Sequence, residues 1–172
     1  MENILESTLL VLQVTPGYWS SLTERLPAEL LTRAPAFQDW SALECLGHLV
    51  DSERLLFPVR LKAFLAGQDF AAFDPIKQGT PLERLSPPVD LARQFAELRL
   101  GSLFLLKDLT ASDLERGVRH PELGPVTLGE MLHEWAAHDL MHTVQAERAL
   151  MQPFIGASGA WRPSFADHDA GG

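Results

Sequence analysis

Apolar residues recur every three or four positions in four long stretches of the chain, at about 3–31, 41–66, 89–109 and 127–151. This spacing places the apolar side chains on one face of an α-helix. The alternation typical of β-strands is scarce. The pattern therefore predicts an all-α fold, in which four amphipathic helices bury their apolar faces against one another as a four-helix bundle.

Short local signals mark helix starts and interruptions. The runs 41–44 (Ser-Ala-Leu-Glu) and 127–130 (Thr-Leu-Gly-Glu) are capping boxes, in which a hydroxyl and a carboxylate pair with free backbone amides. Thr15-Pro16-Gly17 predicts a kink or a restart in the first helix. Pro58 predicts a kink in the second helix, after its first four turns.

Two long connections follow the second and third predicted helices, at 67–88 and 110–126. Both are rich in glycine and proline, and we expect a short turn at 112–116. Connections as long as 67–88 often form the rim or lid of a site, so this one is a candidate to select the substrate. We expect one bundle domain, at 1–152, and an irregular tail, at 153–172, that docks on the bundle or is partly disordered.

Composition and charge narrow the classes of partner. The chain has 172 residues, a net charge of −9 and no cluster of lysine and arginine, which argues against nucleic acid and anionic membranes. The single cysteine, Cys45, excludes an intramolecular disulfide. The sequence starts without the features of a secretion signal, and no apolar run approaches the length of a membrane span. We expect a cytoplasmic protein that acts on a small molecule.

The predicted fourth helix carries two histidines on one face. His138 and His142 are four residues apart, about 40° around the helix axis, so their rings stack toward a common point. Met131, Trp135 and Met141 are expected on the same face, which we therefore place inward. Such a pair is about as often structural as metal-binding, and a third ligand would favour a metal.

His48, in the predicted second helix, supplies this third ligand if the second and fourth helices are neighbours. Three imidazoles leave coordination positions open for water or substrate, as in catalytic metal sites. They also leave a divalent cation its full charge, which lowers the pKa of a bound water or thiol and provides a nucleophile at neutral pH. Zinc, nickel, manganese and iron all accept nitrogen ligands, so the metal stays open.

Residues close to His48 in the sequence offer further ligands, each with a simpler alternative. Asp51 and Glu44 are candidates for a fourth ligand or for a hydrogen-bond acceptor of a ligand imidazole, but solvent exposure and a helix cap are favoured. Cys45 is one turn before His48, where a small buried hydrophobe is favoured over a ligand. Ser52 shares the face of His48.

Glu134 and Trp135 lie about one turn before His138. Glu134 either approaches the histidines or lies at the rim of the bundle. Trp135 is expected in the core rather than against a cofactor. His133 points about 140° away from His138 and is excluded.

Arg99 and His120 are the remaining pocket candidates. Arg99 would suit an anionic substrate, but an ion pair with Glu53 is favoured, because an arginine between helices usually has a carboxylate partner. His120 either lines the mouth of a pocket or lies on the surface, and the surface is favoured. His168 lies in the tail, where metal binding is not expected.

Several motifs resemble the DinB-like family, whose members include bacillithiol transferases. They are Trp40–Glu44, Gly47-His48-Leu49 with Asp51 and Glu53, His120-Pro121 with Gly124, Thr127–Glu130, and His138–Gln145. The resemblance spans roughly residues 1–150. It implies an up-down-down-up bundle, often dimeric, with a divalent metal held by the residues that match His48, His138 and His142.

The resemblance also implies activities: transfer involving a low-molecular-weight thiol, maleylpyruvate isomerisation in mycothiol-dependent relatives, or hydrolase-like chemistry. We therefore expect a homodimeric, metal-dependent enzyme that activates a low-molecular-weight thiol, or water, for transfer to a small electrophile. The alternative is a non-catalytic metal-binding bundle with a structural, stress-response or partner-binding role. Three protein ligands favour the enzyme, and a fourth would favour the alternative.

Overall fold

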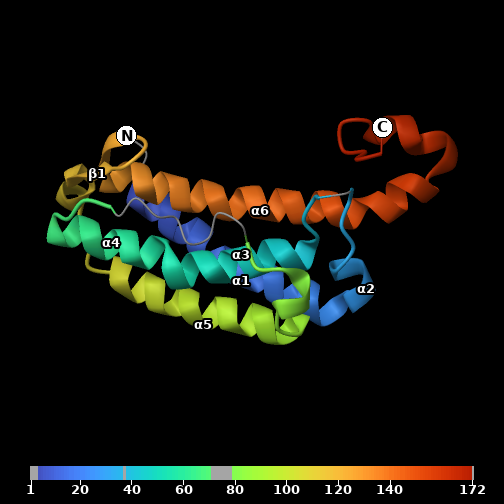
Figure 1. Ribbon diagram of the computed structural model, residues 1–172, viewed down its shortest axis with the longest axis horizontal. Helices are drawn as coiled ribbons and strands as arrows, with labels where there is room; N and C mark the ends of the chain where they lie inside the picture. Colours follow the sequence, from blue (N-terminus) through green and yellow to red (C-terminus); the bar gives the residue numbers. More distant parts are fainter. Residues whose placement is uncertain (1–3, 37, 71–78, 172) are drawn as a thin grey trace.

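The computed structural model describes residues 4–36, 38–70 and 79–171, and it confirms the predicted four-helix bundle (Figure 1). The long elements are α1 (Ile4–Arg25), α3 (Ala42–Leu55) continued by α4 (Phe57–Ala66), α5 (Pro88–Leu106) and α6 (Leu128–Ala157). The short elements are α2 (Ala28–Leu31), the 3₁₀ helices η1 (Leu82–Arg84), η2 (Ala111–Glu115) and η3 (Gly159–Phe165), and the strands β1 (Gly117–His120) and β2 (Gly124–Thr127).

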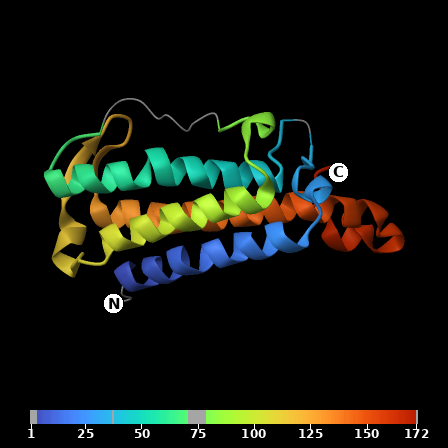
Figure 2. The ribbon, with the colours of Figure 1, turned by 90° about the horizontal axis from the view of Figure 1, so that it is seen from below.

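Helices α1 and α6 are parallel neighbours. Their side-chain hydrogen bonds advance along both helices in the same direction, from Thr8–Leu132 through Thr15–Asp139 to Tyr18–Glu147. Figures 1 and 2 show α3, α4 and α5 running the opposite way. Both α3 and α1 pack against α5 and α6, so α3 lies beside α6, as the metal hypothesis requires.

Two apolar clusters fill the bundle. One surrounds Trp19, Leu46 and Phe95, and the other lies at the hairpin end around Phe57 and Trp135, whose rings stack at 4.8 Å. These side chains are buried, which confirms most of the residues that the sequence pattern placed on the inward faces of the helices.

Met141 is an exception, because its side chain is 54% exposed. Around the axis of α6 the buried arc extends from His138 toward Asp139, which faces α1 and α5, and Met141 lies on the other side of His138. Its predicted inward placement is wrong.

Helix α1 continues through Pro16, so the restart predicted at 15–17 does not occur. Proline has no amide hydrogen, and the carbonyl of Leu12 therefore loses its usual helical donor. Arg99 Nη1 donates to this carbonyl oxygen instead, at 3.0 Å. The chain leaves the helix further on, at Pro27, before the short α2.

The interruption predicted near Pro58 is confirmed, as an end and a restart. Helix α3 ends at Leu55, the backbone of the next residue, Leu56 (φ −115°, ψ −79°), departs from ideal helical values, and α4 begins at Phe57. Pro58 lies in the first turn of α4, where a missing amide hydrogen costs little.

Helix α6 passes through Pro153 and ends at Ala157, so an end near Met151 is wrong. Ile155, in this last turn, is buried, and Pro153 leaves the carbonyl of Ala149 without its usual helical donor. The tail then folds back, because Gln152 donates to the carbonyl of His168 and accepts from the amide of Ala170. The tail is therefore partly helical rather than irregular.

The connection at 110–126 contains η2, close to the expected turn, and an antiparallel hairpin that the sequence pattern did not predict. Its strands have four residues each, too few for an alternating pattern to stand out. Residues 71–78 of the expected substrate-selecting loop, 67–88, lie outside the described part of the chain. None of the described helices is long and apolar enough to cross a membrane.

Candidate metal centre

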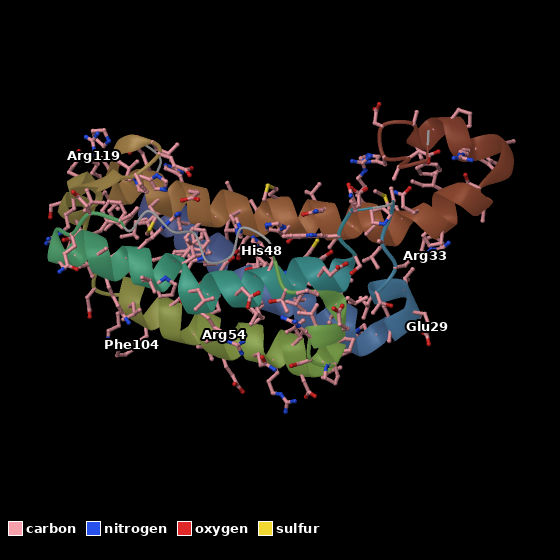
Figure 3. All side chains as sticks on the ribbon, in the orientation of Figure 1. Glu29, Arg33, His48, Arg54, Phe104 and Arg119 are labelled. Atoms are coloured by element: carbon pink, nitrogen blue, oxygen red, sulfur yellow. The ribbon has the colours of Figure 1, made fainter. Side chains whose placement is uncertain are left out.

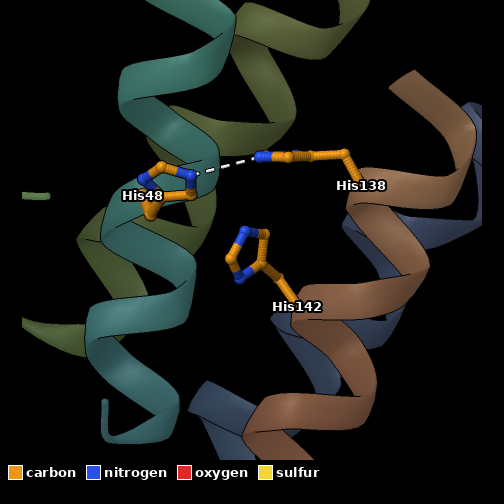
Figure 4. Close-up of side chains that lie close together, drawn as sticks. All are labelled: His48, His138 and His142. Carbon is orange, nitrogen blue, oxygen red and sulfur yellow. Dashed lines mark hydrogen bonds between the residues drawn. The ribbon is translucent and has the colours of Figure 1, made fainter. Parts of the chain in front are cut away.

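The structure brings His48, His138 and His142 together between α3 and α6 (Figure 4). One ring nitrogen from each histidine lies within 4.8 Å of the other two. The Nε2 atoms of His48 and His138 are 3.1 Å apart, and the three ring centroids are separated by 4.5 to 5.1 Å. Figure 3 shows His48 near the middle of the long axis of the molecule, and Figure 4 shows its ring directed toward the helix that carries His138 and His142.

Local sequence explains why α3 presents His48 here. Ser41 and Glu44 form the predicted capping box, which fixes where α3 starts. One residue before His48, Gly47 admits the side chain of Leu85, since a Cβ at Gly47 would lie only 2.5 Å from Leu85 Cδ2. The segment after η1 thus packs directly on the helix beside the metal-binding candidate.

Burial keeps the histidines of α6 neutral. Desolvation, reinforced by the nearby His142 and His48, lowers the pKa of His138 to about 3. Desolvation also lowers the pKa of His142, although a hydrogen bond to Gln145 opposes the shift. Neutral imidazole is the form that binds a cation.

Hydrogen bonding sets the tautomer of His142. Its Nδ1 lies 2.9 Å from Gln145 Oε1, which accepts only, so the ring hydrogen is on Nδ1. His142 Nε2 is then a buried lone pair, and it has no hydrogen-bond partner among the described residues. A divalent cation among the three rings would satisfy this lone pair, so the residues present fit a metal.

Two aromatic residues enclose the histidines, and the sequence did not single them out as site residues. Trp40 stacks on His142, with centroids 5.8 Å apart, and lies 4.9 Å from His48. Phe57 contacts His138 edge-on at 5.3 Å. The sequence signals for Trp40 were its place directly before the capping box of the helix that carries His48 and its place in the motif Trp40–Glu44, which resembles the DinB-like family.

The candidates next to His48 have structural uses. Asp51 accepts a hydrogen bond from Thr80 Oγ1 at 2.5 Å and so ties the returning loop to α3. The carboxylate of Glu44 belongs to the capping box. Ser52 Oγ donates to the carbonyl of His48, not to its ring. Within the described ranges, the group of potential ligands consists of the three histidines, and these residues are not part of it.

Cys45 is fully buried in the apolar core, which agrees with its interpretation as a small hydrophobe. Burial, together with the charge of Glu44, raises the pKa of its thiol to about 12. A thiol of this kind is a poor ligand and a poor nucleophile.

The candidates on α6 also separate from the cluster. Glu134 is half-exposed and faces Arg60 at 3.5 Å. Trp135 is buried in the core, where its indole nitrogen donates to Glu53. His133 is exposed, as expected, and so is His168 in the tail.

Arg99 is enclosed in the bundle and cannot meet a substrate. It forms the predicted ion pair with Glu53, at 2.7 Å, and a second one with Asp139, also at 2.7 Å, that the sequence did not reveal. All three side chains are only 1% exposed. Burial alone would lower the pKa of Arg99, but Asp139 and Glu53 raise it above its usual value. His120, at the end of β1, lies outside the histidine cluster and beside Arg60.

Comparisons with known proteins agree with this architecture. YfiT from Bacillus subtilis, described as a probable metal-dependent hydrolase with an unusual four-helix bundle topology, superposes with a TM-score of 0.72 at 20% identity over 87% of each chain. A protein of Oceanobacillus iheyensis named "Putative metal-dependent hydrolase OB0782" is 27% identical over 106 residues, which is 60% of either chain. The present chain thus spans about 60% of the length of that curated relative. The sequence profile of the DinB superfamily matches residues 12–146, and the chain therefore belongs to the DinB superfamily.

Proposed function

We propose that the protein is a divalent-metal-dependent enzyme that acts on a small molecule. The observation that carries this proposal is the convergence of three ring nitrogens, from His48, His138 and His142, with no carboxylate or thiol in the same group among the described residues. A three-ligand set of this kind leaves positions for water or a reactant, whereas structural sites are usually closed by four protein ligands.

Each residue of the site has a defined task in this proposal. The three histidines would hold a divalent cation, which when bound supplies a Lewis acid that lowers the pKa of a water or thiol. Gln145 orients His142 so that its Nε2 lone pair faces the cluster. Trp40 and Phe57 shield the rings from solvent, which keeps them neutral and strengthens electrostatic interactions with a reactant.

The activated group is proposed to be water or a low-molecular-weight thiol, and the electrophile a small molecule. Hydrolysis is supported by the descriptions of the two relatives, one named "Putative metal-dependent hydrolase OB0782" and the other described as "a probable metal-dependent hydrolase". Thiol transfer is supported by the motifs shared with bacillithiol transferases, and a thiolate is a soft ligand that several divalent metals accept beside imidazoles.

Metal analysis of protein purified without an affinity tag tests the first part of the proposal. We expect about one equivalent of a divalent metal, lost in His48→Ala and in His142→Ala. His133→Ala is the matched control, because it removes an exposed histidine from the same helix. Equal metal content in all four proteins would refute the site.

The cobalt-loaded protein then distinguishes the nucleophiles. Addition of cysteine, glutathione or bacillithiol should produce a sulfur-to-cobalt charge-transfer band if a thiol binds at the cation. Turnover of ester or amide substrates without any thiol would instead establish hydrolysis. If the protein binds metal tightly but neither hydrolyses these substrates nor binds a thiol at the cation, the non-catalytic alternative is supported.

A further inference from the structure

A second group of polar side chains lies about one helical turn from the histidine cluster, toward the hairpin. Arg60 on α4 follows Phe57, which contacts His138, by three residues. Glu134 on α6 precedes His138 by four residues, and its Oε2 lies 3.5 Å from Arg60 Nη1. Four residues advance a helix by about 6 Å, so Arg60 lies within reach of a small molecule bound at the histidines.

His120 faces the other side of the Arg60 guanidinium. Its Nε2 is 3.5 Å from Arg60 Nη2. The ring of Phe70 contacts both partners: it lies 5.3 Å from Arg60 Cζ and meets the His120 ring edge-on at 5.8 Å. An aromatic wall therefore holds the two nitrogen-bearing groups in place.

Backbone hydrogen bonds fix the tautomer of His120. Its Nδ1 accepts from the amides of Glu122, at 3.1 Å, and Leu123, at 3.2 Å. A ring nitrogen that accepts carries no hydrogen, so the hydrogen of the neutral ring is on Nε2. The guanidinium of Arg60 has donors only. Two donor nitrogens thus lie 3.5 Å apart, and an oxygen acceptor that bridges both from one side, at ordinary hydrogen-bond distances, would satisfy them.

We propose that Arg60 and His120 form an anion site that holds a carboxylate of the small-molecule substrate, while the reactive group of the substrate lies at the histidines. This inference rests on the proposed function and specifies its substrate as an organic anion. A guanidinium and a neighbouring N–H donor match the two oxygens of a carboxylate.

The neighbourhood of Arg60 leaves room for such a ligand. Glu134 faces Nη1 rather than Nη2, and its side chain is 51% exposed, so solvent weakens this ion pair. Arg60 also lines a groove of about 500 Å³ along α4, together with Val59, Ala63 and Phe70. A small anion can reach the guanidinium from this groove without unfolding the bundle.

Titration of the metal-free, ¹⁵N-labelled protein with butanoate tests the anion site by NMR. We expect saturable shifts of the Arg60 Nε–H and of the Glu122 and Leu123 amides, and much smaller shifts with the neutral butanamide. Arg60→Gln should weaken butanoate binding about tenfold or more, since it removes a charge-assisted donor pair. The matched control, Arg54→Gln, removes the same charge from an exposed position on α3 and should leave the affinity unchanged.

The variant His120→Asn tests the Nε2 donor separately from the role of His120 in the fold of the hairpin. The asparagine oxygen can still accept from backbone amides two and three residues ahead, as in an Asx turn, but the Nε2 donor is lost. We expect binding weakened about three- to tenfold, with the hairpin signals retained. If His120→Asn does not fold, the butanoate affinity of Arg60→Gln alone tests the anion site.

Equal affinity for butanoate and butanamide would overturn the anion site, and so would equal butanoate affinity in wild type and Arg60→Gln. Butanoate binding only when metal is present would also overturn it, because the carboxylate would then be a metal ligand. Because the titration uses metal-free protein, its result is independent of the metal analysis. Binding that depends on Arg60 in a protein that takes up no metal would preserve the anion site and refute the metalloenzyme.

Discussion

His138 and Asp139 are adjacent in α6, and they connect two different buried groups. His138 faces His48 across the interface with α3, whereas Asp139 accepts from Arg99 of α5 and from Thr15 of α1. Arg99 in turn contacts Glu53 of α3 and the carbonyl of Leu12. The guanidinium of Arg99 thus links all four long helices of the bundle, α1, α3, α5 and α6, directly beside a candidate metal ligand.

Replacement of Arg99 by methionine should destabilise the fold strongly. The substitution leaves Glu53 and Asp139 as buried, unpaired carboxylates, and the loss of one partner of a buried ion pair typically costs about 3–5 kcal/mol. For a chain of this size the melting temperature should fall by roughly 6–20 °C. Arg54→Gln on the exposed surface should change stability by less than about 0.5 kcal/mol. A similar small effect of Arg99→Met would contradict the role of the network.

Gln145→Ala should weaken metal binding while leaving the fold intact. Gln145 accepts from His142 Nδ1 and so orients the ring, and loss of such an orienting partner typically lowers metal affinity about 10- to 100-fold. Competition with a chelator measures the change. Val144→Ala, at a neighbouring exposed position, is the control and should bind metal like the wild type. Unchanged affinity in Gln145→Ala would mean that packing alone positions the ring.

The metal-free protein should lose stability as the pH falls below about 6.5. His138 has a pKa of about 3 in the fold, against a usual value of 6.5, so between these pH values the unfolded chain binds more protons than the native one. The contribution of neutral His138 to the free energy of unfolding is therefore fully present above pH 6.5 and is lost progressively as the pH falls toward 3. Denaturant unfolding of wild type and His138→Gln at several pH values isolates this contribution, because ordinary carboxylates affect both proteins. Parallel stability curves would show that His138 titrates normally in the fold.

Gly47→Ala should have opposite effects in two backgrounds. In the wild type the new methyl group would meet Leu85 at 2.5 Å, and the overpacking should cost about 1–3 kcal/mol. In a Leu85→Ala background the space is free, and the better helix propensity of alanine should add up to about 1 kcal/mol. Chemical denaturation of the four proteins of this cycle measures the coupling. Additive effects would show that the loop moves aside without cost.

The bundle and the histidine cluster were accessible from the sequence because they depend on short-range rules. Two capping boxes fix where α3 and α6 start, and the four-residue spacing of His138 and His142 fixes their common face. The position of His48 opposite them follows once α3 and α6 are neighbours, which the family resemblance supported.

The features that the sequence did not reveal depend on contacts between distant segments. Pro16 is tolerated in α1 because Arg99, far along the chain, supplies the missing donor to Leu12. Helix α6 continues through Pro153, and the neighbouring Gln152 bonds to the backbone of His168 and Ala170 in the tail. The hairpin is too short to produce a pattern, and the stacking of Trp40 on His142 appears only when α6 is in place.

The break at Leu56 divides the second long helix of the bundle into two segments, α3 and α4, which different contacts hold in place. His48 lies on α3, which the capping box and the Arg99 network hold, whereas Phe57 and Arg60 lie on α4, which packs on α6 and the hairpin. Substitutions in α4 are thus expected to change the aromatic contact and the charge beside the histidines while the ring of His48 keeps its position. In the proposed enzyme, selection of the reactant would thus depend on a different helix segment from the one that supplies His48.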